Sequence, residues 1–397
     1  MKNVLGKGEG PLTTRAGVFI PQPGGYRIFE PAPLPPIPPL TFDARFVRLL
    51  SEADLALGEL AGVVRQLPNP DLFVAMYVRQ EAVLSSQIEG TQASLTDVLQ
   101  LEAGEADGEP ERLLDAKEVV NYVAAMNHGI ALLQQLPLSL RLIKQIHERL
   151  MQGVRGENKR PGEFRNGQVH IGPLQGGLSR ATFVPPSPDM LVPALDNFEK
   201  YLHDRELPHL LHAGLCHAQF ETIHPFFDGN GRMGRLLITF LLCEREVLTR
   251  PLLYLSHFLK MHRAEYYDRL QAIRVDGNWE GWLSFFLRGV KEVAHRAIET
   301  AGGILALRER YRETLVKERS PNLVRAFDLL FESPLLTSRM LQSRIEVSAM
   351  TAFKILDRFV SLGILAETTG FKRNRRFLFA PYLALFEGAD SDPRSMG

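Results

Sequence analysis

His224-Pro-Phe-Phe-Asp-Gly-Asn-Gly-Arg-Met-Gly-Arg235 is the most informative segment of this chain. Apolar residues at helical spacing precede it from His209 to Thr222 and resume near Gly231. Pro225 interrupts the first pattern, because proline lacks an N–H and its ring clashes with the preceding helical turn. The segment is therefore predicted to be a loop between two helices that runs into the N-terminus of the second helix.

This position suits a bound anion. The first turn of a helix presents unpaired N–H groups and a partial positive charge. Gly229 and Gly231 have no Cβ, so phosphate oxygens can approach the backbone closely. Arg232 and Arg235 follow on the first turns, where two guanidinium groups can clamp a polyphosphate. The glycines and arginines together predict a phosphate-binding site.

Two further side chains predict the chemistry at that site. Asp228 can hold Mg²⁺, which prefers a carboxylate together with phosphates and water. His224 is the residue of the motif that can act as a base near neutral pH. Phosphoryl or nucleotidyl transfer follows from this set. Residues 229–234 formally match a dinucleotide-binding fingerprint, but that fingerprint needs a preceding strand. A metal pair of His224 and Asp228 would need the unbroken helix that Pro225 prevents.

The composition of the whole chain indicates a globular protein of two or three domains. It has 397 residues, 45% hydrophobic and 23% charged, with a formal net charge of zero, which favours neither nucleic acid nor an anionic membrane as partner. Cys216 and Cys243 lie in apolar helical patterns and suit reduced thiols. The start of the chain lacks a signal-peptide core, and the apolar run 236–243 is too short to span a membrane. We expect a soluble, cytoplasmic protein with no membrane partner.

The chain is predicted to be mainly α-helical. Helices are expected at about 43–65 and 71–89, with Gly90 as a C-terminal stop. Five segments are predicted: 1–41, a Pro-rich extended arm; 42–110, an N-terminal helical region; 111–319, the core that carries the motif; 320–390, a small separate domain; and 391–397, a tail.

Short strands are expected in two places. Residues 169–171 and 181–184 flank Gly176-Gly177 and predict a small β-hairpin. In 320–390, three short helical patterns precede strands at 364–367 and 376–379, which is typical of a winged-helix (α+β) domain. Residues 338–344 followed by 348–359 would suit a helix-turn-helix, and Lys372, Arg373, Arg375 and Arg376 crowd one turn, so DNA is a possible partner through residues 338–376. They can contact DNA phosphates, although many winged helices bind proteins instead.

The motif resembles the signature of the Fic family, H-P-F-x-[DE]-G-N-G-R-x-x-R, at every position. Further segments are similar to that family's surrounding pattern, and the resemblance covers roughly residues 30–300. These segments are 169–173, 181–186, 217–223 and 254–256. The resemblance implies a helical Fic core that transfers AMP from ATP to a Ser, Thr or Tyr hydroxyl of a protein, with Mg²⁺. Related sites remove AMP or transfer UMP, phosphocholine or phosphate, and these alternatives stay open.

The resemblance also implies roles for individual residues. His224 would be the general base and Asp228 the Mg²⁺ ligand. Arg232 would contact the β-phosphate and Arg235 the γ-phosphate, while Phe226 would anchor the loop in the core. The implied nucleotide-binding set is Gly229, Asn230, Gly231, Arg232, Met233, Gly234, Arg235 and, on the adenine side, Tyr267. A packed aromatic is the alternative for Tyr267.

Two more segments resemble family features. The hairpin at 168–185 resembles the flap that holds a protein substrate as an added strand. Ser85-Ser-Gln-Ile-Glu-Gly90 resembles the inhibitory motif [ST]-x-x-x-E-[GN]. It implies that Glu89 pairs with Arg235 and excludes the γ-phosphate, with Ser85 orienting the Glu89 region. Self-modification and a homodimer are also implied. A different class of function, an ATP-sensing DNA-binding regulator, stays open.

Overall fold

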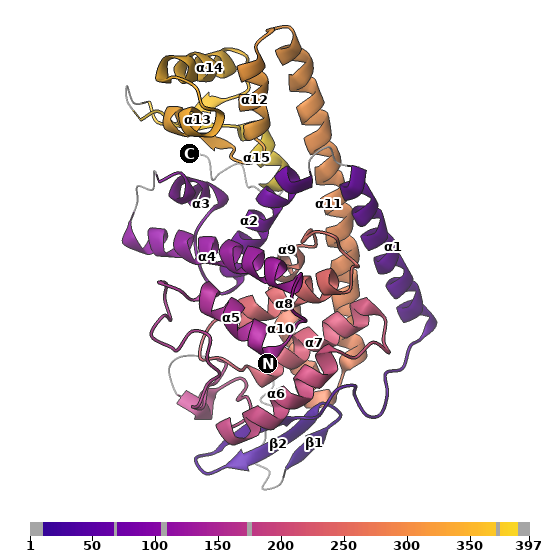
Figure 1. Ribbon diagram of the computed structural model, residues 1–397. Helices are drawn as coiled ribbons and strands as arrows, with labels where there is room; N and C mark the ends of the chain where they lie inside the picture. The colour runs from indigo at the N-terminus through magenta and orange to yellow at the C-terminus, as the bar shows by residue number, and fades with distance from the viewer. Residues whose placement is uncertain (1–10, 67–69, 105–108, 173–176, 371–373, 388–397) are drawn as a thin grey trace. The chain divides into compact units, whose positions relative to one another are not determined.

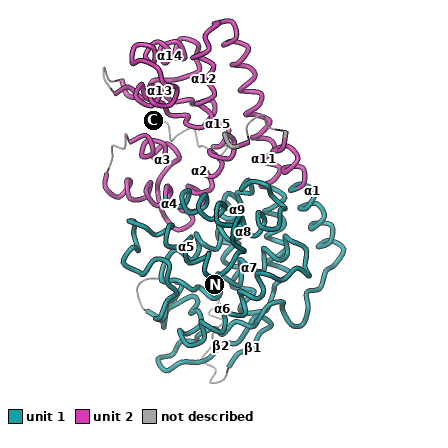
Figure 2. The backbone as a smooth tube through the Cα atoms, viewed as in Figure 1, with its two compact units in different colours: residues 1–57, 121–292 teal, residues 58–120, 293–397 magenta. Residues whose placement is uncertain are grey.

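Helices dominate the computed structural model, which describes residues 11–66, 70–104, 109–172, 177–370 and 374–387 (Figure 1). The mainly α-helical class expected from the sequence is confirmed. The chain forms two compact units, each assembled from two separate stretches (Figure 2). Unit 1 comprises residues 1–57 and 121–292, and unit 2 comprises residues 58–120 and 293–397.

The chain passes between the units inside helices. The three crossing helices are α1 (Ala44–Gln66), α4 (Pro110–Leu133) and α11 (Trp279–Val316). Among the described residues, none of the helices combines the length and the apolar character that crossing a membrane requires.

Unit 1 begins with a three-stranded antiparallel sheet in the order β1 (Leu12–Thr14), β2 (Gly17–Gln22) and β3 (Tyr26–Pro31). The sheet corrects the expected extended arm over residues 1–41, of which residues 1–10 lie outside the described part. Phe19 and Phe29 are paired across β2 and β3, both are buried, and their ring centroids lie 4.6 Å apart. Most prolines of this segment follow β3, so they do not remove donors from the ladder.

The core of unit 1 surrounds α7 (His209–Ile223). Every residue from Leu210 to Ile223 is buried, as in a helix that is enclosed on all sides. Gly214 allows α11 to cross closely, since a Cβ there would lie 2.9 Å from Leu283 Cδ2. The other helices that lie wholly in this unit are α5 (Leu140–Leu150), α6 (Pro188–Leu202), α8 (Asn230–Glu244), α9 (Leu255–Met261) and α10 (Arg263–Asp276).

The hairpin expected at 168–185 is much reduced. One antiparallel bridge joins Ile171 to Phe183. A short 3-10 helix spans Gly177–Arg180. Prolines at 173, 185 and 186 bracket the bridge, and proline cannot donate to a ladder. Residues 173–176, including Gly176, lie outside the described part of the chain.

Unit 2 contains α2 (Pro70–Ile88), close to the expected helix, followed by Gly90 at φ +106°. It also contains α3 (Leu95–Glu102), which was not expected. Ser94 and Asp97 form a capping box at the start of α3, with the Asp97 carboxylate accepting from the Ser94 backbone N–H at 2.8 Å. The aromatic ring of Tyr77 on α2 meets Phe386 at 5.1 Å between centroids.

The C-terminal part of unit 2 has the element order expected for a winged helix. The elements are α12 (Pro321–Leu329), β4 (Leu335–Leu336), α13 (Ser338–Ile345), α14 (Ala349–Ser361), β5 (Ala366–Glu367) and β6 (Phe377–Leu378), with α15 (Ala380–Glu387) added. The sheet order is β4-β6-β5. Lys372 and Arg373, predicted in the basic turn, and the tail 391–397 lie outside the described residues.

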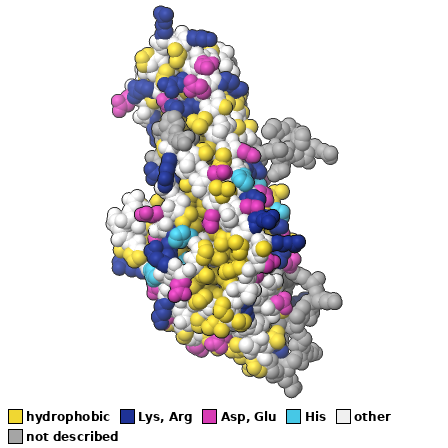
Figure 3. All heavy atoms as spheres, turned by 90° about the vertical axis from the view of Figure 1, so that its right-hand side faces the viewer, with side chains coloured by type: hydrophobic (Ala, Val, Ile, Leu, Met, Phe, Trp, Pro, Cys, Tyr) yellow, Lys and Arg dark blue, Asp and Glu magenta, His cyan; other side chains and the backbone are white. Residues whose placement is uncertain are grey.

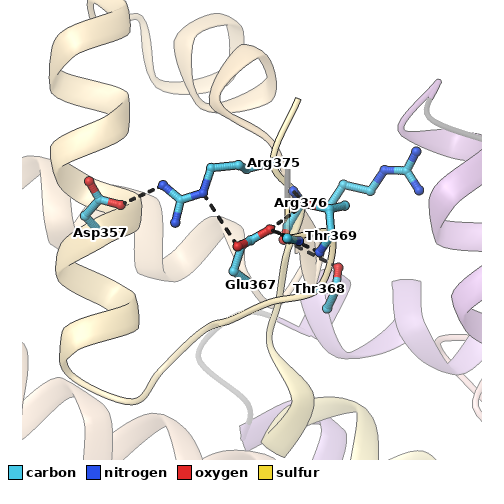
Figure 4. A network of polar contacts seen from close by, with 7 residues as sticks. Asp357, Glu367, Thr368, Thr369, Arg375 and Arg376 are labelled. Atoms are coloured by element: carbon cyan, nitrogen blue, oxygen red, sulfur yellow. Dashed lines mark hydrogen bonds and ion pairs between the residues drawn. The ribbon is translucent and has the colours of Figure 1, made fainter. Parts of the chain in front are cut away.

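Arg375 ties the β5–β6 turn to α14 (Figure 4). Its guanidinium lies 3.1 Å from Asp357 on α14 and 3.8 Å from Glu367 on β5. Thr369 donates to the same Glu367 carboxylate. One of the basic side chains expected to face DNA is therefore held by acidic groups of its own domain.

Hydrophobic side chains also reach the surface. Figure 3 shows them gathered in one area of the face that it presents, among scattered charged side chains. In unit 1 the most exposed large one is Ile37, at 80%, in the proline-rich segment after β3.

Candidate active site

His224 lies where α7 ends. It occupies the C-cap position with left-handed backbone angles, φ +51° and ψ +61°, and its N–H donates to the Phe220 carbonyl at 2.9 Å. This conformation costs a residue with a side chain about 1–2 kcal/mol, so contacts around the loop must hold it. The side chain is half-buried, in keeping with a base that a substrate must reach.

Arg165 provides those contacts. Its guanidinium is buried and donates only to backbone carbonyls around the start of the motif. The acceptors are His224 at 2.8 Å, Pro186 at 2.7 Å, Gly167 at 3.1 Å and Ile223 at 3.3 Å. Burial lowers the pKa of Arg165 to about 10, so it stays protonated at neutral pH. Sequence reasoning missed this residue, because a lone arginine far from the motif gives no signal.

Phe226 anchors the loop in the core, as the resemblance implied. Its fully buried ring stacks on His147 with centroids 3.6 Å apart and planes at 1°. His147 Nδ1 accepts from the Gly162 N–H at 2.9 Å, so Nε2 carries the hydrogen and donates to the Asp228 carbonyl at 2.9 Å. Burial lowers the pKa of His147 to about 4, which keeps the ring neutral.

Asn230 closes the loop upon itself. Its side-chain oxygen accepts from the Phe226 N–H at 2.9 Å, and its amide nitrogen donates to the Phe226 carbonyl at 2.8 Å. The side chain therefore shapes the loop, and its backbone N–H is the group that can meet a nucleotide. Gly229 precedes it at φ +75°, where a Cβ would lie 2.7 Å from Met151 Sδ. Both the backbone angle and the limited space favour glycine there.

Positive charge is concentrated at the start of α8. The N-cap is Gly229, which has no side chain to satisfy the first-turn N–H groups. Arg232 and Arg235 follow on successive turns, and both are at least 95% buried. Guanidinium groups rarely reach this depth without acceptors or an anion around them. The two guanidinium groups and the helix N-terminus therefore place positive charge together at this end of α8.

Asp228 has the environment of a single metal-ligating carboxylate. One oxygen accepts from the Gly229 N–H at 2.7 Å, and the other lies 3.8 Å from Lys159 Nζ, with the side chain 40% exposed. In the described part of the chain, three His, Cys, Asp or Glu side chains do not gather to form a metal site. The donor set fits Mg²⁺ held by one carboxylate, with phosphates and water completing the shell.

Two residues of the implied nucleotide-binding set have packing roles. Met233 is fully buried. Gly234 faces α7, where a Cβ would lie 2.6 Å from Glu221 Oε1. Its carbonyl accepts from His217 Nδ1 at 2.9 Å, and His217 Nε2 then accepts from the Tyr266 hydroxyl at 2.9 Å. These contacts pack α7 against α8, and the nucleotide-binding role of Met233 and Gly234 stays a prediction.

Tyr267 is the exposed neighbour of that buried tyrosine. Its side chain is 38% exposed on α10, and the Arg263 guanidinium lies 5.7 Å from its ring centroid. Its ring centroid also lies 5.0 Å from that of Tyr266, so the adenine-side role of Tyr267 stays a prediction.

The two residues of the implied inhibitory pair belong to different units. Ser85 is buried within α2, and Glu89 follows the end of that helix in unit 2, whereas Arg235 belongs to unit 1. The Glu89 backbone N–H donates to the Ser86 carbonyl at 3.0 Å, which forms a turn after the helix.

Comparison with known proteins identifies both halves of the central region. Residues 47–131 match the Fic/DOC family N-terminal profile, and residues 137–242 match the Fic/DOC family profile. The chain carries the two domains of the Fic/DOC family. The motif and its arginines lie inside the Fic domain, and the Ser85–Gly90 segment lies inside the Fic N-terminal domain.

Curated relatives of this Fic protein share moderate identity with it. The protein adenylyltransferase Fic of Aedes aegypti is 30% identical over 217 residues, which cover 53% of this chain and 39% of that protein. The protein of the same name from Drosophila yakuba is 28% identical over 266 residues, covering 65% and 48%. The matched part thus spans less than half the length of either relative.

Solved structures share the Fic fold. A Fic family protein from Desulfovibrio desulfuricans G20 has a TM-score of 0.55 at 21% identity and covers 86% of this chain and 97% of that one. A Fic domain containing signaling protein from Bacteroides thetaiotaomicron VPI-5482 has a TM-score of 0.50 at 18% identity, covering 64% and 97%. At these identities the likeness concerns the fold alone.

Proposed function

We propose that this Fic protein is a protein adenylyltransferase, which transfers AMP from ATP to a Ser, Thr or Tyr hydroxyl of a protein. The observation that carries the proposal is the start of α8. His224 lies at the end of α7 and is followed by the partly exposed carboxylate of Asp228. Helix α8 then begins without a side-chain cap and carries two buried arginines. Curated relatives named protein adenylyltransferase Fic support the same reaction.

In the proposed mechanism, His224 takes the proton from the target hydroxyl as its oxygen attacks the α-phosphorus of ATP. The bond from the α-phosphorus to the oxygen that leads to the β-phosphate breaks, and pyrophosphate leaves. Arg232 and Arg235 hold the β- and γ-phosphates, and the backbone of residues 229–231 supports the α- and β-phosphates. Bound Mg²⁺ would supply charge neutralisation on the phosphates, with Asp228 as its protein ligand.

We also propose that Glu89 restrains this activity through an ion pair with Arg235. The pair would deny Arg235 to the γ-phosphate, so ATP would bind in an unproductive pose. Support comes from the motif Ser85–Gly90 within the Fic N-terminal domain and from the position of Glu89 directly after a buried helix.

Labelling with α-labelled ATP and Mg²⁺ tests both proposals. Glu89→Gly should label the protein itself and lysate proteins at least tenfold more than the parent chain, and adding His224→Ala should abolish that labelling. Glu59→Gly, another exposed glutamate of unit 2, is the matched control and should not raise labelling. Equal labelling by parent and Glu89→Gly contradicts the restraint, whereas labelling that survives His224→Ala contradicts the base.

The alternatives are separated by the product. The mass added to a modified protein distinguishes AMP from UMP, phosphocholine and phosphate. Loss of AMP from a pre-modified target would indicate the reverse reaction. The proposed protein substrate docks as a strand along the flap at 168–185. Homodimerisation is a further proposal, and light scattering of the full chain measures it.

A DNA-binding regulator that senses ATP is the second candidate. The observation in its favour is the winged-helix order of elements, with α13 and α14 placed as a helix-turn-helix within residues 338–376. Strong sequence-specific DNA binding, together with no label transfer from Glu89→Gly, would favour this function over the enzyme.

A further inference from the structure

The base of the flap is fastened where Phe183 lies opposite Ile171. Its carbonyl accepts from the Ile171 N–H at 2.8 Å and its N–H donates to the Ile171 carbonyl at 3.1 Å. These two bonds form the bridge between the two sides of the flap. Phe183 is 2% exposed, so this side of the bridge is buried in the protein.

The N-terminal sheet continues into this bridge. The Phe29 N–H on β3 donates to the Val184 carbonyl at 2.9 Å, and the Phe29 ring lies 5.8 Å from that of Phe183. Backbone hydrogen bonds therefore run from β1 through β2 and β3 to Val184, and from its neighbour Phe183 to Ile171. The flap is an extension of a formed sheet and not an isolated loop.

The side chain of Arg274 contacts both the Phe183 ring and the end of α7. Its guanidinium carbon lies 3.8 Å from the centroid of Phe183. Its Nε donates to Thr222 Oγ1 at 3.3 Å and its terminal nitrogen donates to the Glu221 carbonyl at 3.2 Å. Both acceptors belong to the last turn of α7, directly before His224. The Arg274 carbonyl in turn accepts from Thr14 Oγ1 on β1 at 3.1 Å.

The charge and shape of arginine suit this position. A cation is stabilised by the carbonyl end of a helix and by the face of an aromatic ring. Arg274 is 5% exposed, and although burial lowers its pKa to about 10, it stays protonated at neutral pH. A planar guanidinium can stack on the ring and donate from its edge at the same time, which an ammonium group cannot.

We propose that Arg274 is a positioning residue that fixes the base of the flap relative to His224, and that the sheet β1–β3 completes this brace through Thr14 and Phe29. A substrate strand laid along the flap would then present its hydroxyl at a set distance from the base. This inference rests on the proposed function for its effect on transfer, but the brace itself is measurable without any activity.

The first experiment measures the brace alone. Hydrogen exchange on the full chain should show the amides of Ile171, Thr182 and Phe183 exchanging at least tenfold faster in Arg274→Lys than in the parent. Amides in the middle of α7 should not change. Thr14→Val should give a smaller change in the same direction. Unchanged exchange at the flap amides in Arg274→Lys would overturn the proposal, whether or not the chain transfers AMP.

The second experiment measures transfer in the Glu89→Gly background. Arg274→Lys should lower the rate of self-labelling at least tenfold, while the KM for ATP stays within twofold, because the phosphate-binding groups of α8 are untouched. Phe183→Leu should behave like Arg274→Lys, and Phe183→Tyr, which keeps the aromatic face, should restore most of the rate. Arg288→Lys is the matched control, since that arginine also lies over an aromatic ring, at 5.3 Å from Phe258.

The outcomes separate the two proposals. No labelling by the Glu89→Gly parent, with faster flap exchange in Arg274→Lys, would refute the transferase and keep the brace. Labelling by the parent, with equal rates in Arg274→Lys and Arg288→Lys, would refute the brace as a positioning device and keep the transferase. A parallel rise in KM for ATP would instead assign Arg274 a general structural role and overturn its positioning role.

Discussion

At the scale of single residues, the candidate site depends on side chains that never meet a substrate. His224 has an unfavourable backbone conformation, and Arg165 stabilises the loop around it through four carbonyl contacts. His147 and Asn230 fix the next part of the loop. The reactive groups are therefore preorganised by neighbours that are themselves fully hydrogen-bonded, as precise catalytic geometry requires.

The buried histidines predict how stability depends on pH. Burial lowers the pKa of His147 and of His217 from 6.5 to about 4, so both are neutral in the folded protein. In the unfolded chain each takes up a proton below pH 6.5. Folding stability should therefore be independent of these groups above pH 6.5 and fall as the pH drops toward 4, by up to about 1.4 kcal/mol per pH unit for each histidine.

Urea unfolding at pH 7 and at pH 5 measures this loss. His147→Gln should lose less stability between the two pH values than the parent chain, although its stability at pH 7 is lower. His128→Gln, at an exposed position, should show the parent's pH dependence. A variant of His147 with the full pH dependence would show that its neutral state is not required for folding.

The site could be predicted from sequence only where its residues are neighbours in the chain. The loop between two helices, the place of His224 at the end of α7 and the place of Arg232 and Arg235 at the start of α8 follow from local spacing. Arg165, His147 and Arg274 could not be predicted, because each acts across 50 residues or more on backbone atoms that any sequence would supply. For Asn230 the sequence predicts a backbone contact with the nucleotide, and the structure adds a side chain that braces the loop.

At the scale of elements, the packing of α7 against α8 sets the site. Gly234→Ala should destabilise the protein by about 1–3 kcal/mol, because the new Cβ would lie 2.6 Å from Glu221 Oε1 and 3.3 Å from Phe220 Cδ1. Gly302→Ala on α11 is the control. It has no atom within 4 Å of its Cβ position, and it should stabilise the protein by up to about 1 kcal/mol. Urea unfolding compares the two, and equal stability would contradict the predicted clash.

The elements that sequence reasoning misjudged are short ones. The N-terminal sheet was obscured by nearby prolines, although its alternation places Phe19 and Phe29 inward. The capping box of Ser94 and Asp97 would have indicated α3. The flap was expected as two strands, but its prolines leave one bridge. In each case one or two residues decide the secondary structure of the segment against its average sequence pattern.

At the scale of the whole molecule, the C-terminal domain is expected not to bind DNA specifically. Arg375 is held by Asp357 and Glu367, and the exposed side of α14 carries Met350 and Phe353. A gel shift of the full chain at 50 mM salt should therefore show at most weak binding that is lost by about 200 mM salt, as for contacts to phosphate alone. Retention of one sequence over competitor DNA at the higher salt would contradict this and support a regulator.

The division of each unit into two separate stretches has a consequence for synthesis. Unit 1 can close as soon as residue 292 has left the ribosome, because all of its parts have then been made. The second stretch of unit 2, residues 293–397, is made about 5–20 s later at the usual rate of translation. During that time the Fic domain would be folded, whereas the segment that carries Glu89 would belong to a unit 2 that is not yet fully synthesised. Newly made molecules would then pass through a brief period in which the active site is assembled before its restraint.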